Sequence, residues 1–346
     1  MPRLPPDELS ATVAAIFRAA GAEDEAASLV ADALVDAELC GHPSHGVIRV
    51  SEYLGQIREG AIDPAAEPDI VSDRGSAIVV DGHWGFGQVV ATRATGWLIE
   101  RARERGSAAV AVRCCGHVGR AGVYPELAAA HGLVAFAFVN GGGAKPRLAP
   151  HGGRQAVFGT NPVAAAVPLP GSEPVVIDFS TAAVASGKIR VLRERGEPLP
   201  EGWILDAEGR PSTSAEDYYA GGMLLPAAAH KGYALSLLVE LLAGCLTGAG
   251  SPGVPDSSYR VGNGLFLQAF DVEAFMPLES FAHAVLALAD VVRDTPPATG
   301  HERVMLPGEP ERRLAAERAR DGVEVTPSTW QNIASEAAGL GIELAG

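Results

Sequence analysis

The stretch Gly248-Ala249-Gly250-Ser251-Pro252-Gly253 has the glycine spacing of a dinucleotide-binding turn but stands in the wrong place for one. It is the only G-x-G-x-x-G match in the sequence. In the doubly wound dinucleotide-binding fold that pattern follows a strand and opens a helix. Here it follows the apolar segment 228–246, which has the length of a helix, and it contains a proline. We therefore predict a helix end and a loop at this position, and a fold without a Rossmann turn.

The segments around this stretch alternate between helical and strand patterns. Three helical segments open the chain, at 9–20, 23–39 and 44–59, and a proline-marked linker spans 64–68. Further helices are predicted at 88–105, 123–131, 228–246, 281–293 and 309–321. Strands are predicted at 70–71, 77–80, 108–113, 133–139, 164–168, 175–178 and 265–270. Turns are expected at Asp81-Gly82 and, as a hairpin or loop, at 206–210.

Composition narrows the class of protein. The 346 residues suggest two domains, and 47% hydrophobic with 20% charged residues is typical of a globular protein. A formal net charge of −15 argues against nucleic acid or an anionic membrane as a partner. The longest apolar run, 234–246, contains Glu240, so no membrane span is expected. We expect a cytoplasmic protein, because no signal segment and no C-x-x-C pair is present among Cys40, Cys114, Cys115 and Cys245.

A histidine and an arginine lie four residues apart in Ser44-His45-Gly46-Val47-Ile48-Arg49. If Ser44 caps a helix, His45 and Arg49 share one face of its first turns. The positive end of the helix dipole would disfavour the charged imidazole, and a bound carboxylate would favour it. Such a pair suits a small oxo acid, with Arg49 holding the carboxylate and His45 giving a proton to the carbonyl oxygen. Taken alone, the motif is more typical of an ordinary helix start.

Four other polar stretches are candidate ligand sites. The glycine-rich turn 116–122 and the cation of His230-Lys231 at a helix start could cradle a pyrophosphate. The loop 159–162 offers Thr160, and Asp178 ends a strand at a sheet edge where ligands often bind. Each stretch alone is equally typical of a turn, a solvated lysine or a helix cap.

Seven motifs occur together and in an order that resembles the malate/L-lactate dehydrogenase family, a non-Rossmann group of oxidoreductases. They are Ser-His-Gly-x-x-Arg (44–49), Gly-His-x-Gly-x-x-Gly (116–122), Gly-Gly-x-x-x-x-Phe-Gly-Thr-Asn-Pro (152–162), Asp-Phe-Ser-Thr (178–181), His-Lys-Gly-Tyr (230–233), Gly-Asn-Gly-Leu-Phe-Leu (262–267) and Pro-Gly-Glu (307–309). The resemblance runs from about residue 4 to at least residue 330. The family includes ureidoglycolate, sulfolactate and diketogulonate oxidoreductases and the cyclic imino acid reductases.

The resemblance implies roles for particular residues. His45 matches the proton donor, Arg49 matches the substrate-carboxylate arginine, and His117 matches a histidine given the acid/base role in some members. Substrate contacts would also come from Ser44 and Thr160. The implied contacts to NAD or NADP fall on His117, Val118, Gly119, Arg120, Ala121, Asp178, Phe179, Ser180, His230, Lys231, Pro307, Gly308 and Glu309. Arg312 and Arg313 are candidates for a 2′-phosphate, although an arginine-rich helix face is more often only solvated. No metal is implied.

The resemblance also implies an α+β fold with a mostly antiparallel mixed sheet flanked by helices, and a helical domain built from both chain ends. On this basis we expect an N-terminal helical domain at 1–72 and a cofactor and substrate domain at 73–284. A C-terminal helical segment at 285–346 would pack with the N-terminal domain. Members of the family are usually homodimers.

Three departures from the family pattern bear on the substrate. Cys114-Cys115 and Val118 replace Asn-Ser and Phe around His117, and Phe179-Ser180 replaces Met-Ala after Asp178. Lys188 stands where the imino acid reductases have an aspartate that orients the histidine. This difference favours hydroxy acids and leaves the group that orients His45 unnamed.

We therefore expect an enzyme that transfers a hydride between NAD(P)H and C2 of a small 2-oxo or 2-hydroxy acid. The alternatives are a cyclic 2-imino acid reductase and a family member that only binds a small acid or nucleotide. A metal-dependent hydrolase or lyase using His42 and His45 is a third alternative, but it lacks a recognisable ligand spacing.

Overall fold

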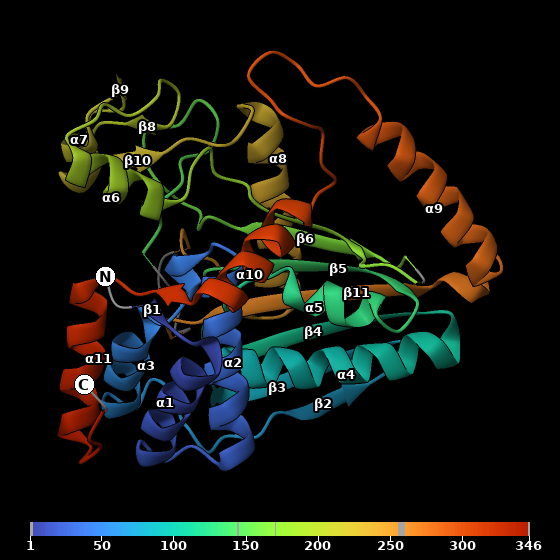
Figure 1. The fold of residues 1–346 in the computed structure, drawn as a ribbon, viewed down its shortest axis with the longest axis horizontal. Helices are drawn as coiled ribbons and strands as arrows, with labels where there is room; N and C mark the ends of the chain where they lie inside the picture. The colour runs from blue at the N-terminus through green and yellow to red at the C-terminus, as the bar shows by residue number, and fades with distance from the viewer. Residues whose placement is uncertain (1–2, 144, 170, 255–259, 345–346) are drawn as a thin grey trace.

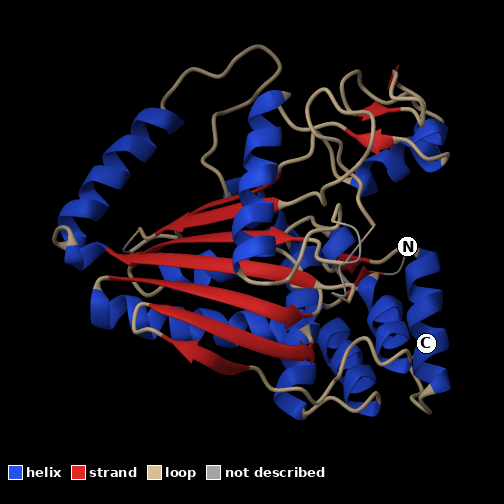
Figure 2. Ribbon diagram, turned by 180° about the vertical axis from the view of Figure 1, so that it is seen from behind, coloured by secondary structure: helices blue, strands red, loops and turns tan. Residues whose placement is uncertain are grey.

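A seven-stranded mixed sheet forms the centre of the protein in a computed structural model that describes residues 3–143, 145–169, 171–254 and 260–344 (Figures 1 and 2). Its strand order is β2-β3-β4-β11-β5-β6-β7, and every neighbouring pair is antiparallel except β3 and β4. The strands are β2 (Asp69–Asp73), β3 (Ala77–Gly85), β4 (Ser107–Cys115), β11 (Asn263–Asp271), β5 (Leu133–Asn140), β6 (Pro162–Val167) and β7 (Val175–Ser180). The mostly antiparallel α+β fold implied by the family resemblance is confirmed.

Two helices cover one face of this sheet, α4 (Gly87–Arg105) and α5 (Val123–Ala129) (Figure 1). Alternate residues of the central strands point toward them, because successive side chains of a strand face opposite sides. Val110, Ala137 and Leu267 are buried in this way and share one core cluster with Val90 and Leu98 of α4. The sheet is therefore fixed at its centre, next to the turn that joins β4 to α5.

The two chain ends build one helical unit, on which N and C lie at the same end in Figure 1. It contains α1 (Pro6–Ala19), α2 (Asp24–Leu39), α3 (Arg49–Arg58) and α11 (Pro327–Gly339). Leu9, Phe17 and Tyr53 from the N-terminal part share a core cluster with Val323 and Ile333 from the C-terminal part. Strand β1 (Arg3–Leu4) pairs with β12 (Val323–Glu324), and α10 (Glu309–Asp321) packs on α2.

The opposite face of the sheet carries α8 (His230–Val239), which continues as a π-helical segment, η2 (Glu240–Leu246) (Figure 2). One continuous helix was expected at 228–246, and the structure changes its hydrogen-bonding pattern halfway. The π segment presents the Glu240 carboxylate to two buried amides, Asn161 at 2.8 Å and Asn140 at 3.0 Å. This buried network ties α8 and η2 to β5 and to the loop before β6.

The remaining elements lie at the periphery of the sheet. A small unit with its own apolar cluster contains α6 (Ser186–Arg195), β8 (Ile204–Leu205), β9 (Pro211–Ser212), α7 (Ala215–Tyr219) and β10 (Met223–Leu224). The segment 206–210 forms the β8–β9 hairpin, as expected. The short helices η1 (Pro43–His45) and η3 (Val272–Ala274) and the outlying helix α9 (Leu278–Arg293) complete the fold. In the part of the chain that the structure describes, no helix has the length and apolar character needed to cross a membrane.

Two expectations about the elements are wrong. The predicted turn at Asp81-Gly82 does not form, because β3 continues to Gly85 and pairs there with Cys115. The strand is irregular in between, where His83 and Trp84 have positive φ and the pairing register shifts between Asp81 and Gly85. The second error is the helix 44–59, described below. The domain boundaries at 72/73 and 284/285 stay predictions, and the second one falls inside α9.

Candidate active site

The segment that contains His45 is a bent turn rather than the start of a helix. Residues Pro43–His45 form η1, Gly46 is extended at φ −91° and ψ −155°, and α3 begins only at Arg49. Ser44 therefore does not cap α3, which has no side-chain cap. The expected capped helix is wrong at this point, although His45 and Arg49 still lie in one site.

A buried carboxylate explains the bend. Glu38 of α2 is 5% exposed, and its Oε1 accepts a hydrogen bond of 3.0 Å from the backbone N–H of Val47. A Cβ atom on Gly46 would lie 2.1 Å from the same oxygen, so any larger residue there requires the Glu38 side chain or the turn to shift. Sequence analysis missed Glu38, and its signal was a glutamate among the buried positions of the 23–39 helix. Burial raises the pKa of Glu38.

His45 is held by a chain of three further side chains. Its Nδ1 lies 3.2 Å from Nε2 of His117, and the two rings are within 6° of parallel. Nδ1 of His117 lies 2.6 Å from the hydroxyl of Tyr53, to which Nε2 of Gln88 donates at 2.8 Å. The group that orients His45 is thus His117, backed by Tyr53 and Gln88. Sequence analysis missed Tyr53 and Gln88, whose signals were a tyrosine four residues after Arg49 and a glutamine at the start of the 88–105 helix.

Burial sets the charge of both histidines. It lowers the pKa of His45 to about 4, with smaller contributions from the charges of Arg49, His42 and Arg120. Burial likewise lowers the pKa of His117 well below its ordinary value, assisted by Arg49 and His45. The lowered pKa of His45 agrees with the expectation that its charged form is disfavoured, but the main cause is desolvation rather than a helix dipole. Both imidazoles are neutral at pH 7.

Arg49 stands beside this pair as a partly exposed cation. Its Nε donates to the backbone oxygen of Ser44 at 2.7 Å, and its Nη1 donates to Glu52 at 2.6 Å. These two contacts hold the guanidinium next to the turn that carries His45. A fixed cation, two neutral imidazoles and a tyrosine hydroxyl thus come together from segments far apart in the sequence.

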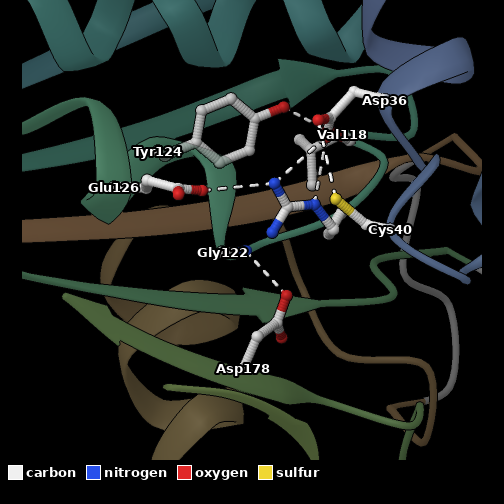
Figure 3. Close-up of polar contacts among 8 residues, drawn as sticks. Asp36, Cys40, Val118, Gly122, Tyr124, Glu126 and Asp178 are labelled. Atoms are coloured by element: carbon white, nitrogen blue, oxygen red, sulfur yellow. Dashed lines mark hydrogen bonds and ion pairs between the residues drawn. The ribbon is translucent and has the colours of Figure 1, made fainter. Parts of the chain in front are cut away.

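The turn after β4 is fixed by close packing and by hydrogen bonds. A Cβ on Gly87 would lie 2.3 Å from the carbonyl of His117, so the glycine lets α4 begin directly against the turn. The backbone N–H of Val118 donates to Asn263 at 2.9 Å, and Tyr124 donates to the carbonyl of Val118 (Figure 3). Val118 and Ala121 are themselves buried. This packing sets where the imidazole of His117 points.

Arg120 follows in the same turn and is paired rather than free. Its side chain is 8% exposed and donates to Asp36 at 3.0 Å and to Glu126 at 3.2 Å (Figure 3). The N–H of Gly122 donates to the carboxylate of Asp178 at 2.7 Å and so ties the turn to β7 (Figure 3). Arg120 therefore holds the turn against α2 and α5.

A cavity of about 280 Å³ opens between this turn, β7 and the start of α10. Five of the predicted cofactor residues line it, namely Arg120, Asp178, Phe179, Pro307 and Gly308. The lining also includes His42, Ile177, Glu311 and Arg312. Phe179 and Ile177 supply an apolar wall, with exposed fractions of 42% and 37%. One carboxylate oxygen of Glu311 is buried without a hydrogen-bond partner among the described residues.

Other predicted site residues lie outside this cavity. His230 and Lys231 are exposed at the start of α8, with the ring of His230 6.1 Å from that of His151. The carbonyl of Thr160 accepts a hydrogen bond of 2.9 Å from Ser180. Glu309 pairs with Arg293 at 2.7 Å.

The two arginines considered for a 2′-phosphate, and the alternative of a metal site, can be compared with the structure. Arg312 donates to the carbonyl of Pro174, whereas Arg313 contacts Met305 on an exposed face. Within the described ranges, no group of three or more His, Cys, Asp and Glu side chains is arranged to hold a metal ion.

Comparison with known proteins identifies the family. Residues 4–334 match the malate/L-lactate dehydrogenase family, so the chain belongs to this family of oxidoreductases. The L-lactate dehydrogenase of Cupriavidus necator is 39% identical over 318 residues, which cover 90% of each chain.

Solved structures agree with this assignment. The sulfolactate dehydrogenase of Methanocaldococcus jannaschii superposes with a TM-score of 0.91 at 32% identity, covering 99% of this chain and 98% of that one. The Δ1-piperideine-2-carboxylate reductase of Pseudomonas syringae pathovar tomato superposes with a TM-score of 0.84 at 30% identity, covering 97% and 100%.

Proposed function

We propose that this chain is an NAD(P)-dependent 2-hydroxy acid dehydrogenase that interconverts a small 2-oxo acid and its 2-hydroxy acid. The observation that carries the proposal is the pair of neutral imidazoles, His45 and His117, held 3.2 Å apart beside the cation of Arg49. The relatives named above act on hydroxy acids of this kind or on a cyclic imine.

Arg49 would hold the carboxylate of the substrate. Its planar guanidinium offers two parallel N–H donors to a carboxylate, and its present partner Glu52 is 46% exposed at the side chain, so an anionic substrate competes with it. Ser44 and Thr160 are proposed as neighbouring substrate contacts. A carboxylate bound at Arg49 also offsets the cation that lowers the pKa of both histidines.

His45 would exchange the proton at the substrate oxygen: as the imidazolium, favoured once a substrate carboxylate offsets the charge of Arg49, it gives the proton to the carbonyl oxygen in reduction and becomes neutral, and as the neutral imidazole it takes the proton of the hydroxyl in oxidation. His117 is proposed to support this role through its contact with Nδ1 of His45. Between turnovers the proton is exchanged with solvent. General acid–base help of this kind contributes about 10²–10⁴-fold to the rate.

The residues around the cavity fit part of a nicotinamide dinucleotide. Phe179 and Ile177 supply an apolar wall for a ring, and the carboxylates of Asp178 and Glu311 are acceptors for sugar hydroxyls. The N-terminus of α10 and Arg312 are suited to a phosphate. We propose that His117, Val118, Gly119, Arg120, Ala121 and Ser180 complete this side of the site, with His230, Lys231 and Glu309 as outer contacts. When bound, the nicotinamide supplies or accepts the hydride.

A cyclic imino acid is the second candidate substrate, because the piperideine-carboxylate reductase shares the fold over nearly the whole chain. Against it stands Lys188, an exposed residue of α6. It adjoins Gly187, where an added Cβ atom would lie 3.8 Å from Cβ of Ser44. A cation at this place matches an anionic oxo acid better than a cationic imine.

We also propose a cytoplasmic homodimer. Support comes from Leu237, Leu238, Leu241 and Leu246, which are between 38% and 61% exposed along α8 and η2. Cys40, Cys115 and Cys245 are free thiols within the described residues. Light scattering on the purified protein should give twice the chain mass of 35.7 kDa, and a double Leu238→Glu, Leu241→Glu variant should give the chain mass. A monomer at micromolar concentration would contradict the homodimer.

The function is tested by titrating the protein with NADH and NADPH and then following nicotinamide absorbance with a panel of acids. The panel contains pyruvate, oxaloacetate, a sulfonated oxo acid and a cyclic imino acid. We expect saturable binding of one cofactor and its oxidation by an oxo acid. Binding of neither cofactor contradicts the proposal, and turnover only with the imine supports the second candidate.

A further inference from the structure

We propose that Tyr53 and Gln88 are positioning residues that fix the direction of the hydrogen-bond chain and thereby keep the proton of His45 on Nε2. Nε2 is the ring nitrogen that faces away from His117. The inference rests on the proposed function for its purpose, but the chain itself is a property of the ligand-free protein.

The first step is the burial of the two residues behind the histidine pair. Tyr53 and Gln88 are each 1% exposed, so no bulk water competes for their polar atoms. Tyr53 lies between Gln88 at 2.8 Å and Nδ1 of His117 at 2.6 Å. A phenol oxygen can accept two hydrogen bonds, but its one O–H also needs an acceptor when it is buried; of its two partners, the one that does not donate to it must accept that proton.

The amide of Gln88 selects that direction. Its Nε2 donates to the hydroxyl of Tyr53, and its Oε1 is buried without a partner among the described residues. Turning the amide over would place the NH₂ group at the unpartnered position and leave both of its N–H donors unsatisfied there. Buried, unpaired N–H groups are rarer in proteins than under-used carbonyl oxygens. The observed orientation of the Gln88 amide, with its Nε2 toward Tyr53, therefore leaves fewer buried donors unpaired than the flipped one.

The orientation of the Gln88 amide fixes where the protons of Tyr53, His117 and His45 lie. The oxygen of Tyr53 accepts a hydrogen bond from Gln88, and its own O–H donates a hydrogen bond to Nδ1 of His117. A neutral His117 then carries its proton on Nε2 and donates it to Nδ1 of His45, 3.2 Å away. A neutral His45 must in turn carry its proton on Nε2. Both histidines are neutral at pH 7, as their burial requires.

This arrangement has a consequence for the substrate. In the ligand-free protein His45 presents an N–H group, rather than a lone pair, to the carbonyl oxygen of an oxo acid that approaches its Nε2, which suits the reduction direction; in oxidation the other tautomer, with Nε2 unprotonated, accepts the proton of the hydroxyl. A neutral imidazole held by its other nitrogen is a known way of polarising a substrate carbonyl. The position of the proton would then be decided by Tyr53 and Gln88, neither of which needs to touch the substrate.

The test is nitrogen-15 NMR of histidine-labelled protein without ligands, which shows which ring nitrogen carries the proton. His45→Gln and His117→Gln variants assign the signals. We expect both histidines to be protonated on Nε2 in the wild type. Tyr53→Phe and Gln88→Met should each move His117 toward the Nδ1-protonated form or a mixture. Tyr218→Phe removes another buried tyrosine hydroxyl, hydrogen-bonded to Ser186 and Arg147, and should leave both signals unchanged.

Kinetics give the second readout. Tyr53→Phe should lower kcat by up to ~10²-fold, since small errors in catalytic geometry cost about this much, with an unchanged dissociation constant for the cofactor. If Tyr53→Phe does not fold, Gln88→Met carries the same test. Wild-type His45 protonated on Nδ1, or tautomers unchanged in the folded variants, would overturn the inference. Correct tautomers in a protein that reduces no oxo acid would instead refute the proposed function and leave the inference standing.

Discussion

The imidazole of His45 has its pKa lowered to about 4 by burial, and its Nδ1 lies 3.2 Å from Nε2 of His117. We expect His45→Ala to lower kcat by about 10²–10⁴-fold, because it removes the group proposed to exchange the substrate proton. Cofactor binding, measured by fluorescence titration, should stay nearly unchanged. A variant that keeps its kcat and shows only a raised KM would contradict this role.

Arg49 is the residue whose shape, rather than only its charge, is predicted to matter. Arg49→Lys keeps the cation but loses the planar fork, so kcat/KM for the oxo acid should fall by at least tenfold, since charged hydrogen bonds contribute ~1.5–3 kcal/mol each. Arg58→Lys, in the same helix and paired with Glu336 on the surface, is the matched control. Equal kcat/KM values for Arg49→Lys and the control would remove Arg49 from the substrate site.

At the scale of the element, the turn between η1 and α3 depends on a glycine packed against a buried carboxylate. Gly46→Ala places a methyl group 2.1 Å from Oε1 of Glu38, so either the turn or the Glu38 side chain, which accepts the hydrogen bond from Val47, must shift. We expect the free energy of unfolding to fall by ~1–3 kcal/mol, as overpacking in a core typically costs, together with a loss of kcat.

Gly96→Ala is the control for this substitution. Gly96 lies inside α4, and a Cβ atom there meets nothing within 4 Å. Alanine at this helical position should raise the free energy of unfolding by ~0.5–1 kcal/mol. Urea denaturation measures both variants, and a Gly46→Ala protein as stable and active as wild type would show that the turn tolerates movement.

At the scale of the whole molecule, the partly buried, neutral histidines make stability depend on pH. The pKa of His45 is about 4 in the folded protein and 6.5 in a model peptide, so the unfolded chain binds more protons between these values. The free energy of unfolding therefore decreases as the pH falls from about 6.5 to 4, and His45 contributes up to ~3 kcal/mol of this loss.

A comparison of two proteins isolates this contribution. Urea denaturation of the wild type and of His45→Gln at pH 7.5 and pH 4.5 should show a smaller loss in the variant. The raised pKa of Glu38 and of Asp178 acts in both proteins and cancels in the comparison. An equal pH dependence would show that His45 is protonated as easily in the folded state as in the unfolded state.

The sequence by itself determined most of the elements and the chemistry available to the site. Periodicity and glycine stops placed α2 and the central strands to within a few residues, since each pattern is local and each element buries its own face. The motif resemblance named His45, Arg49 and His117 as the residues of interest. The short helices α6 and α7 were not predicted, and α11 was expected only as an unspecified part of the C-terminal helical segment at 285–346.

Only the tertiary structure decided what surrounds those residues. The bend at Gly46 depends on Glu38, which accepts a hydrogen bond from the backbone N–H of Val47, nine residues further along the chain. The chain behind His45 joins Tyr53 of α3 to Gln88 of α4 and to His117 after β4. Contacts of this kind depend on packing between distant segments, and packing decides the burial that makes both histidines neutral. A local sequence pattern records neither the neighbour nor the loss of water, so the protonation of the site belongs to the folded molecule.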